Sequence, residues 1–285
     1  MQNSTLVLES QVDWLTVAYH GRAKTDYLGG VASSLVLAET DEGNDVRPFD
    51  LNGYVGWRVG RVRYGERESA GLLQLSGQLA SDHFDELVPE ASTISRLDLA
   101  VTVLPTPIDP GYGADLYECF CAYHSEHQTS ALPWRVQDAH GGQTVYLGAR
   151  TGDQFFRCYD KEQESRASGD TKAFPRYIGT WRHELELHDD AARVVARSLH
   201  AERDRAAGVN GMVYSYVRAH GGQPDWNAAE RPLLEAGFRR RSDRDSRLRW
   251  FRKQVAPALA RELQRGNPHE VWRSLGLDEP PAGMD

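Results

Sequence analysis

The chain has 285 residues, enough for one large domain or two small ones with a substantial core. Its content of 40% hydrophobic and 26% charged residues is ordinary for a globular protein, and no stretch approaches the ~20 apolar residues of a membrane span. The net charge of −8 argues against a uniformly basic, nucleic-acid-binding surface. Three cysteines and no basic-then-apolar leader pattern predict reduced thiols, a cytoplasmic location and no membrane partner.

The first part of the chain is predicted to be mostly strand. Runs that alternate apolar and polar residues, bounded by turn residues, indicate the strands. They are Asp13–His20, Gly53–Tyr64, Gly71–Ser76 and Ile94–Leu104. A short helix is expected over Ser81–Leu87, with Ser81 as its N-cap. The proline-rich and glycine-rich segment Leu104–Gly113 is expected to be a loop.

The second part repeats this theme of strands followed by a helix. Helices are expected over Ala114–Ser125 and Asp190–Asp204, and from about Trp226 onward. The strands expected between them are Gln143–Leu147, Gln154–Lys161 and Tyr177–Leu187. The pattern favours an α+β fold with largely antiparallel sheet and helices packed on one side. We expect a catalytic region over 1–225, suggesting two related halves at 1–105 and 140–225, and a helical basic region over 226–285.

Two of these strands carry acidic residues on their polar faces. Arg96 and Asp98 share a face of Ile94–Val103, and Arg182, Glu184 and Glu186 share a face of Trp181–Leu187. If the strands are neighbours, Asp98, Glu184 and Glu186 converge into an oxygen-rich site that suits Mg or Mn. Cross-strand ion pairs on an exposed sheet face are the alternative interpretation.

A third strand, Gln154–Lys161, places a tyrosine between two cations. Period-two alternation puts Arg157, Tyr159 and Lys161 on one face. Positive charge nearby would lower the pKa of Tyr159 below about 10 by stabilising the phenolate. The strand therefore predicts a nucleophile with an anion clamp, although composition alone favours an ordinary strand tyrosine.

A basic segment lies near the end of this acidic chain. Between Arg239 and Arg265 there are ten Lys or Arg against three acidic residues, a local charge of +7. This segment predicts local DNA binding, with a solvated arginine-rich helix as the alternative. The DNA-binding candidates are Arg239, Arg240, Arg241, Arg244, Arg247, Arg252 and Lys253.

The order and spacing of several short motifs resemble the replication initiation factor (Rep_trans) family, whose members start rolling-circle replication of plasmids and phage or act as relaxases of mobile elements. The motifs run almost end to end through the chain. They are Asp13-Trp14-Leu15-Thr16-Val17, Leu75-Ser76-Gly77, Arg96-x-Asp98-x-Ala100, Tyr146-Leu147-Gly148-Ala149-Arg150, Tyr159-Asp160-Lys161, Arg182-x-Glu184, Trp250–Pro257 and Leu275-Gly276. Thr102 departs from the pattern, because many relatives have an acidic residue there.

The resemblance implies a metal-dependent nickase in which Tyr159 attacks one DNA strand at a replication origin and joins its 5′ phosphate. Asp98 and Glu184 would hold the metal, and Glu186 would either join them or act as a base for Tyr159. Lys161 and Arg157 would assist Tyr159, and Arg96 and Arg182 would contact phosphate or support the ligands. The partners would be origin DNA, a single strand at the nick site and a second copy of the chain. No G-x-x-x-x-G-K-[ST] motif is present, so a separate host or element helicase must unwind the DNA. A conjugative relaxase and a non-catalytic DNA-binding regulator remain alternatives.

Overall fold

The computed structural model describes residues 7–104, 112–129, 131–137, 142–167, 176–224, 226 and 228. The chain divides into two compact units, Met1–Gly237 and Phe238–Asp285, and all described residues belong to the first. The expected loop over Leu104–Gly113 is described only at its two ends. The helical region expected from about Trp226 lies almost entirely outside the described residues. The division between residues 225 and 226 stays a prediction.

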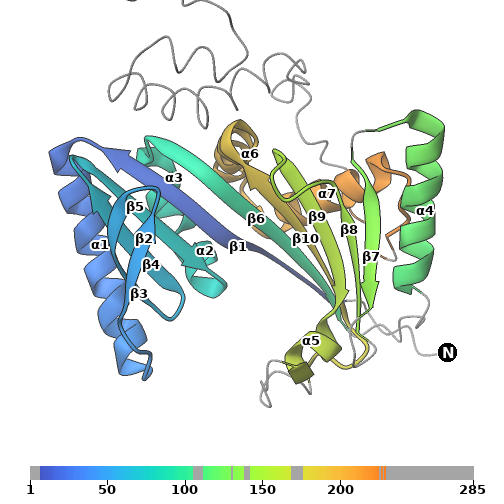
Figure 1. The fold of residues 1–285 in the computed structure, drawn as a ribbon, viewed down its shortest axis with the longest axis horizontal. Helices are drawn as coiled ribbons and strands as arrows, with labels where there is room; N and C mark the ends of the chain where they lie inside the picture. The colour runs from blue at the N-terminus through green and yellow to red at the C-terminus, as the bar shows by residue number, and fades with distance from the viewer. Residues whose placement is uncertain are drawn as a thin grey trace, which may run out of the picture. The chain divides into compact units, whose positions relative to one another are not determined.

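The described strands form one sheet in which every neighbouring pair is antiparallel (Figure 1). Its order is β2-β3-β4-β5-β1-β6-β10-β9-β8-β7. The strands are β1 (Val7–His20), β2 (Arg47–Leu51), β3 (Tyr54–Val59), β4 (Val62–Arg67), β5 (Ala70–Ser76), β6 (Thr93–Leu104), β7 (Pro133–Gln137), β8 (Gln143–Leu147), β9 (Gln154–Asp160) and β10 (Trp181–His188). The expected α+β fold with largely antiparallel sheet is confirmed.

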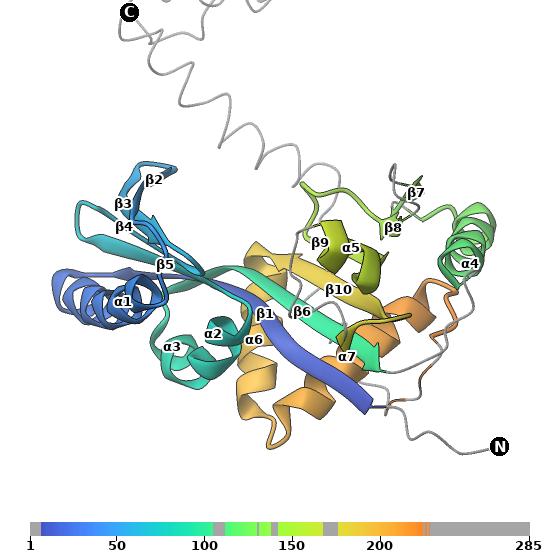
Figure 2. The same ribbon diagram turned by 90° about the horizontal axis from the view of Figure 1, so that it is seen from below.

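Most of the described helices cover one face of this sheet, called here the back face. Figure 2 shows α1, α2, α3 and α6 on that side and α5 on the opposite, front side. The helices are α1 (Arg22–Asp41), α2 (Gln78–Asp82), α3 (Phe84–Glu90), α4 (Tyr112–His127), α5 (Lys161–Ala167), α6 (Asp189–Ala201) and α7 (Arg205–Ala219). The described helices therefore leave room for a site on the front face beside α5.

The core lies between the back face and the helices. Leu99 and Val101 of β6 and Leu185 of β10 are fully buried there, as are Val195 of α6 and Val213 of α7 to within a few per cent. Alternation explains the arrangement, because every second residue of these strands is apolar and points to the same side.

Several expected elements differ from the observed ones. The strand expected over Gly53–Tyr64 is two strands, β3 and β4, because the chain reverses at Gly60, whose φ is 49°. The helix expected over Ser81–Leu87 is two short helices, and Ser81 lies inside α2 rather than capping a helix. The long helix α1 and the strand β2 occupy a stretch for which the sequence predicted no element.

The two halves of the sheet share one topology. In each, a long strand (β1 or β6) is followed by a helix and then by four strands, the last of which returns beside the long strand. Each half ends in helices, and β1 pairs with β6 at the centre. Among the described elements, only α5 breaks the correspondence. This topology places β6 at the start of the second half, whereas the sequence placed it at the end of the first; the duplication itself stays a proposal.

Candidate active site

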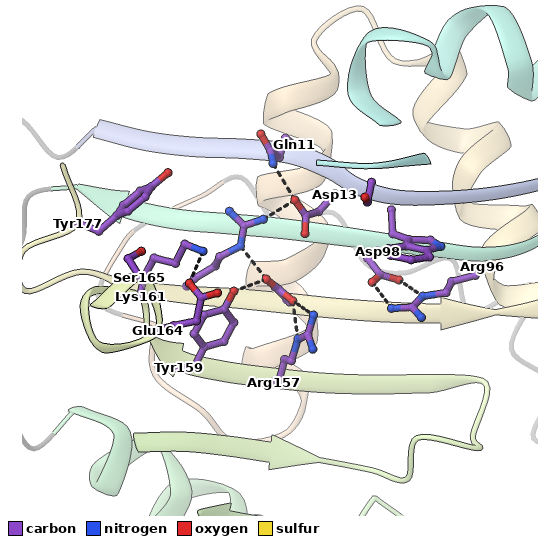
Figure 3. A pocket seen from close by; sticks show the side chains of 14 residues that line it. Gln11, Asp13, Arg96, Asp98, Arg157, Tyr159, Lys161, Glu164, Ser165 and Tyr177 are labelled. Carbon is purple, nitrogen blue, oxygen red and sulfur yellow. Dashed lines mark hydrogen bonds and ion pairs between the residues drawn. The ribbon is translucent and has the colours of Figure 1, made fainter. Parts of the chain in front are cut away.

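A polar pocket of about 600 Å³ lies on the front face (Figure 3). Strands β1, β6, β10 and β9 form its floor, and α5 and Tyr177 border it. Most of the residues singled out in the sequence line it, namely Arg96, Asp98, Arg157, Tyr159, Lys161, Arg182 and Glu184. Glu186 sits directly across from Asp98 on the neighbouring strand. The structure therefore brings the three predicted strands together on one face.

Register explains which of these side chains meet. Arg182 lies opposite Tyr159 and Glu184 lies opposite Arg157 in the β10–β9 ladder. Directly opposed residues on antiparallel strands have Cβ atoms about 5 Å apart, which is within reach of a hydrogen bond between long side chains.

Glu184 is the centre of the hydrogen-bond network. Its Oε1 accepts from the Tyr159 hydroxyl at 2.6 Å and from Arg182 Nε at 2.7 Å. Its Oε2 accepts from Arg157 Nε at 2.5 Å. Burial alone would raise the pKa of Glu184, but Arg182, Arg157 and the Tyr159 hydroxyl lower it to about 2. The carboxylate is thus ionised, and both of its oxygens accept hydrogen bonds.

Arg182 fixes this network to the centre of the sheet. Besides Glu184, its guanidinium contacts Asp13 Oδ1 of β1 at 2.6 Å and Thr102 Oγ1 of β6 at 3.2 Å. The side chain is 9% exposed. Thr102 therefore acts as an acceptor for a buried arginine.

A second network lies beside the first. Arg96 donates to both oxygens of Asp98, at 2.9 and 2.6 Å, and to Glu186 Oε2 at 2.9 Å. His188 Nε2 lies 2.7 Å from the other oxygen of Glu186. Burial raises the pKa of Asp98 to about 6, against the lowering effect of Arg96. Arg96 thus occupies the position between two acids that a cation would take.

The acids in this arrangement do not fit a metal ion. Asp98, Glu184 and Glu186 share the front face as expected, but guanidinium groups already hold each of them. Among the described residues, no group of three or more His, Cys, Asp or Glu is placed to hold a metal. A hard divalent cation would need several of these oxygens free. The acids are held in ion pairs, but these pairs are buried and two of them lie within one strand, unlike the exposed cross-strand pairs of the alternative interpretation. The predicted ligand set stays a prediction.

The expected effect of the cations on Tyr159 is wrong for this arrangement. Burial and the charge of Glu184 raise its pKa well above 10, and the lowering effect of Arg182 is smaller. Lys161 does not share the strand face with Tyr159, because it begins α5. Its Nζ lies 5.8 Å from the Tyr159 ring centre and pairs with Glu164 at 2.6 Å. The phenol is therefore held protonated, as a donor to Glu184.

Sequence reasoning missed Asp13 and Gln11 as pocket residues. Gln11 Nε2 donates to Asp13 Oδ1 at 2.8 Å, and Asp13 pairs with Arg182. A register shift between Val12 and Trp14 lets Asp13 and Trp14 both line the pocket although they are adjacent in the chain. The motif Asp13-Trp14-Leu15-Thr16-Val17 was the signal that could have pointed to Asp13, and no sequence signal pointed to Gln11.

The polar residue His183 of β10 lies on the other side of the sheet. It is fully buried on the back face, with Nε2 at 2.8 Å from the Tyr112 hydroxyl. The DNA-binding candidates between Arg239 and Lys253 lie outside the described residues and stay predictions. None of the described helices is long and apolar enough to cross a membrane.

The front face thus presents a tyrosine hydroxyl, together with arginines that pair with carboxylates, in one open polar pocket. The chain matches the family described as "Replication initiation factor" over residues 92–265, more than half of its length, and it belongs to this family. No curated protein matches the chain. The solved "Structure of Rolling Circle Replication Initiator Protein from Geobacillus stearothermophilus" is 21% identical with a TM-score of 0.49, and the match covers 80% of this chain and 91% of that one. At this identity and TM-score, the likeness supports no functional conclusion.

Proposed function

We propose that this protein initiates rolling-circle replication by cutting one DNA strand at an origin, with Tyr159 as the nucleophile. Its membership in the replication initiation factor family supports this proposal. The observation that carries it is the 2.6 Å contact between the Tyr159 hydroxyl and Glu184, in an open pocket that also contains Arg157 and Arg182. A hydroxyl beside a carboxylate and arginines suits attack on a phosphodiester.

In the proposed reaction, Tyr159 Oη forms a bond to phosphorus and the bond from phosphorus to the 3′ oxygen breaks. The phenol proton passes to Glu184, and the departing 3′ oxygen takes up a proton from water to become the 3′ hydroxyl that primes synthesis. The 5′ phosphate stays on Tyr159 as a diester. This ester keeps the energy of the broken bond, so the later closure needs no ATP.

Glu184 is too acidic in the described arrangement to take this proton readily, since its pKa is about 2. The two arginines that hold it differ in exposure. The side chain of Arg157 is 32% exposed, whereas that of Arg182 is 9% exposed. We therefore assign Arg157 to the incoming phosphate and Arg182 to holding Glu184 in place. When Arg157 turns from Glu184 to the phosphate, the pKa of Glu184 would rise and the carboxylate would become a better base.

The test is cleavage of supercoiled DNA that carries the element's own origin. The parent should relax the DNA and become linked to its 5′ end, and Tyr159→Phe should do neither. Tyr123→Phe is the matched control, because Tyr123 stacks on His127 of α4 and does not line the pocket. Nicking retained by Tyr159→Phe would reject the nucleophile. Origin binding by the parent without any nicking would indicate a DNA-binding regulator.

The dependence on Mg or Mn stays a prediction, and the same assay addresses it. Reactions with MgCl2, with MnCl2 and with a chelator compare the activity directly. Replication and conjugative transfer would use the same nicking step, so a relaxase is separated by asking whether the element moves between cells. The helicase and a homodimer also remain predictions.

A further inference from the structure

The N-terminal half of the sheet carries a row of arginines in direct cross-strand register. Arg47 of β2 lies opposite Arg58 of β3, and Arg58 lies opposite Arg63 of β4. The same row continues through Gln74 of β5 and Thr16 of β1 to Arg96 of β6. At about 4.8 Å for each neighbouring strand, the five steps from Arg47 to Arg96 cover about 24 Å along the sheet.

The outer part of this row is unlike the arginines of the pocket. Arg96, Arg157 and Arg182 each contact a carboxylate. Within the described ranges, no acid lies within ion-pair distance of Arg58 or Arg63, and Arg47 has only an exposed contact with Asp45 at 3.8 Å. Like charges directly opposite each other on neighbouring strands destabilise a sheet. Three arginines opposite one another therefore destabilise the sheet, and the fold alone does not explain why they are there.

Arg63 shows the lack of a partner most clearly. Its Nη1 is buried and has no hydrogen-bond partner. Burial lowers the pKa of its guanidinium, and the charges of Arg58 and Arg96 lower it further. A buried donor without an acceptor is costly, so an anion supplied from outside would remove the cost.

Trp14 connects the row to the pocket. The guanidinium carbon of Arg63 lies 4.8 Å from the centre of the Trp14 ring, and that of Arg96 lies 4.5 Å from it. Trp14 and Arg96 both line the pocket that contains Tyr159. A strand that leaves Tyr159 in this direction would therefore meet Trp14, then Arg63, then Arg58.

We propose that Arg47, Arg58 and Arg63, called here the arginine row, bind the phosphates of the single DNA strand that flanks the nick site. The inference rests on the proposed function, since it needs a strand at Tyr159. Charge complementarity supports the proposal, because phosphates would supply hydrogen-bond acceptors to arginines that have no buried carboxylate partner among the described residues. Phosphate contacts carry no sequence preference, so the arginine row positions the strand and leaves recognition of the origin to other residues.

The experiment compares full-length parent with Arg58→Gln/Arg63→Gln on single-stranded oligonucleotides. One covers the nick site only, and two others extend it on the 5′ or the 3′ side. The double variant should bind one of the two extended oligonucleotides at least about tenfold more weakly than the parent does. Its affinity for the short oligonucleotide should equal that of the parent. Its salt dependence should become shallower by about 0.7 for each lost contact. Its thermal stability should equal or exceed that of the parent, because like charges have been removed.

Arg197→Gln/Arg203→Gln is the matched control, since it removes the same charge from exposed positions on and beside α6 of the back face. Binding of every oligonucleotide as tightly as this control would overturn the proposal, and so would an equal loss on all three. A loss confined to duplex origin DNA would also overturn it. Arg58→Gln alone, at an exposed residue, repeats the measurement if the double variant fails to fold.

The outcome separates the arginine row from the proposed function. Nicking by Tyr159 with unchanged binding in the double variant would refute the row and leave the function standing. Weaker binding of the flanking strand by the variant, together with no nicking by the parent, would support the arginine row and refute the proposed function.

Discussion

Replacing Glu184 by Gln removes the charge at the centre of the pocket network. Three donors surround this carboxylate, and together they lower its pKa from about 4.5 to about 2. That difference corresponds to about 3 kcal/mol of stability at neutral pH. Truncating one partner of a buried ion pair costs about 3 to 5 kcal/mol. We expect the lower value, because Arg182 keeps its contact with Asp13.

Urea unfolding followed by circular dichroism, at a series of pH values, measures this cost. Because the folded pKa lies below the unfolded one, the stabilisation is complete above about pH 4.5 and disappears toward about pH 2. The difference between parent and Glu184→Gln should therefore shrink as the pH falls through this range. The control Glu118→Gln, at an exposed position of α4, should show no such difference. A difference below about 1 kcal/mol at neutral pH, or one that does not change with pH, would refute the reasoning.

Three further outcomes are expected. Burial lowers the pKa of His183 to about 3, so as the pH falls the unfolded chain takes up a proton before the folded chain does. The free energy of unfolding of the parent, measured in urea titrations, should therefore fall by about 2 kcal/mol between about pH 6.5 and 5. This loss should be absent in His183→Gln. Arg96→Gln leaves Asp98 and Glu186 without their guanidinium, so thermal unfolding should show a loss of about 3 kcal/mol and a larger stabilisation by MnCl2 than the parent shows. Phe156→Ala empties a fully buried position of the back face and should cost about 3 to 5 kcal/mol in urea unfolding, with no change in m-value.

Strands with strict alternation could be predicted from the sequence, and α1 could not. β6 and β10 alternate over their full length, and their expected ends lie within four residues of the observed ones. The buried positions of α1 have helical spacing, but they begin with Thr25 and end with Glu39, which read as surface residues. The preceding Gly21 makes no side-chain cap. Glu39 is buried because it accepts from the backbone N–H of Arg61 at 2.7 Å, a contact across the fold that no local pattern reveals.

For the site, alternation indicated which residues share a face, and register decided which of them are partners. Asp98 and Glu184 were correctly expected on one face, and their pairs with Arg96 and Arg182 lie within a single strand. The pair of Glu184 with Arg157 and that of Arg96 with Glu186 depend instead on side-chain reach between strands. Local pattern therefore predicted a cluster of acids, whereas the structure has acids neutralised one by one.

The central β1–β6 pair has a consequence for anyone who divides this chain. The family match begins at residue 92, just before β6, which suggests that the second half could be expressed alone. Such a fragment would lose Asp13, the acid that β1 supplies to Arg182. It would also turn the twelve-residue strand β6 into a bare edge, open to pairing with other copies. A fragment cut there should precipitate or form fibrils, and its inactivity would say nothing about Tyr159.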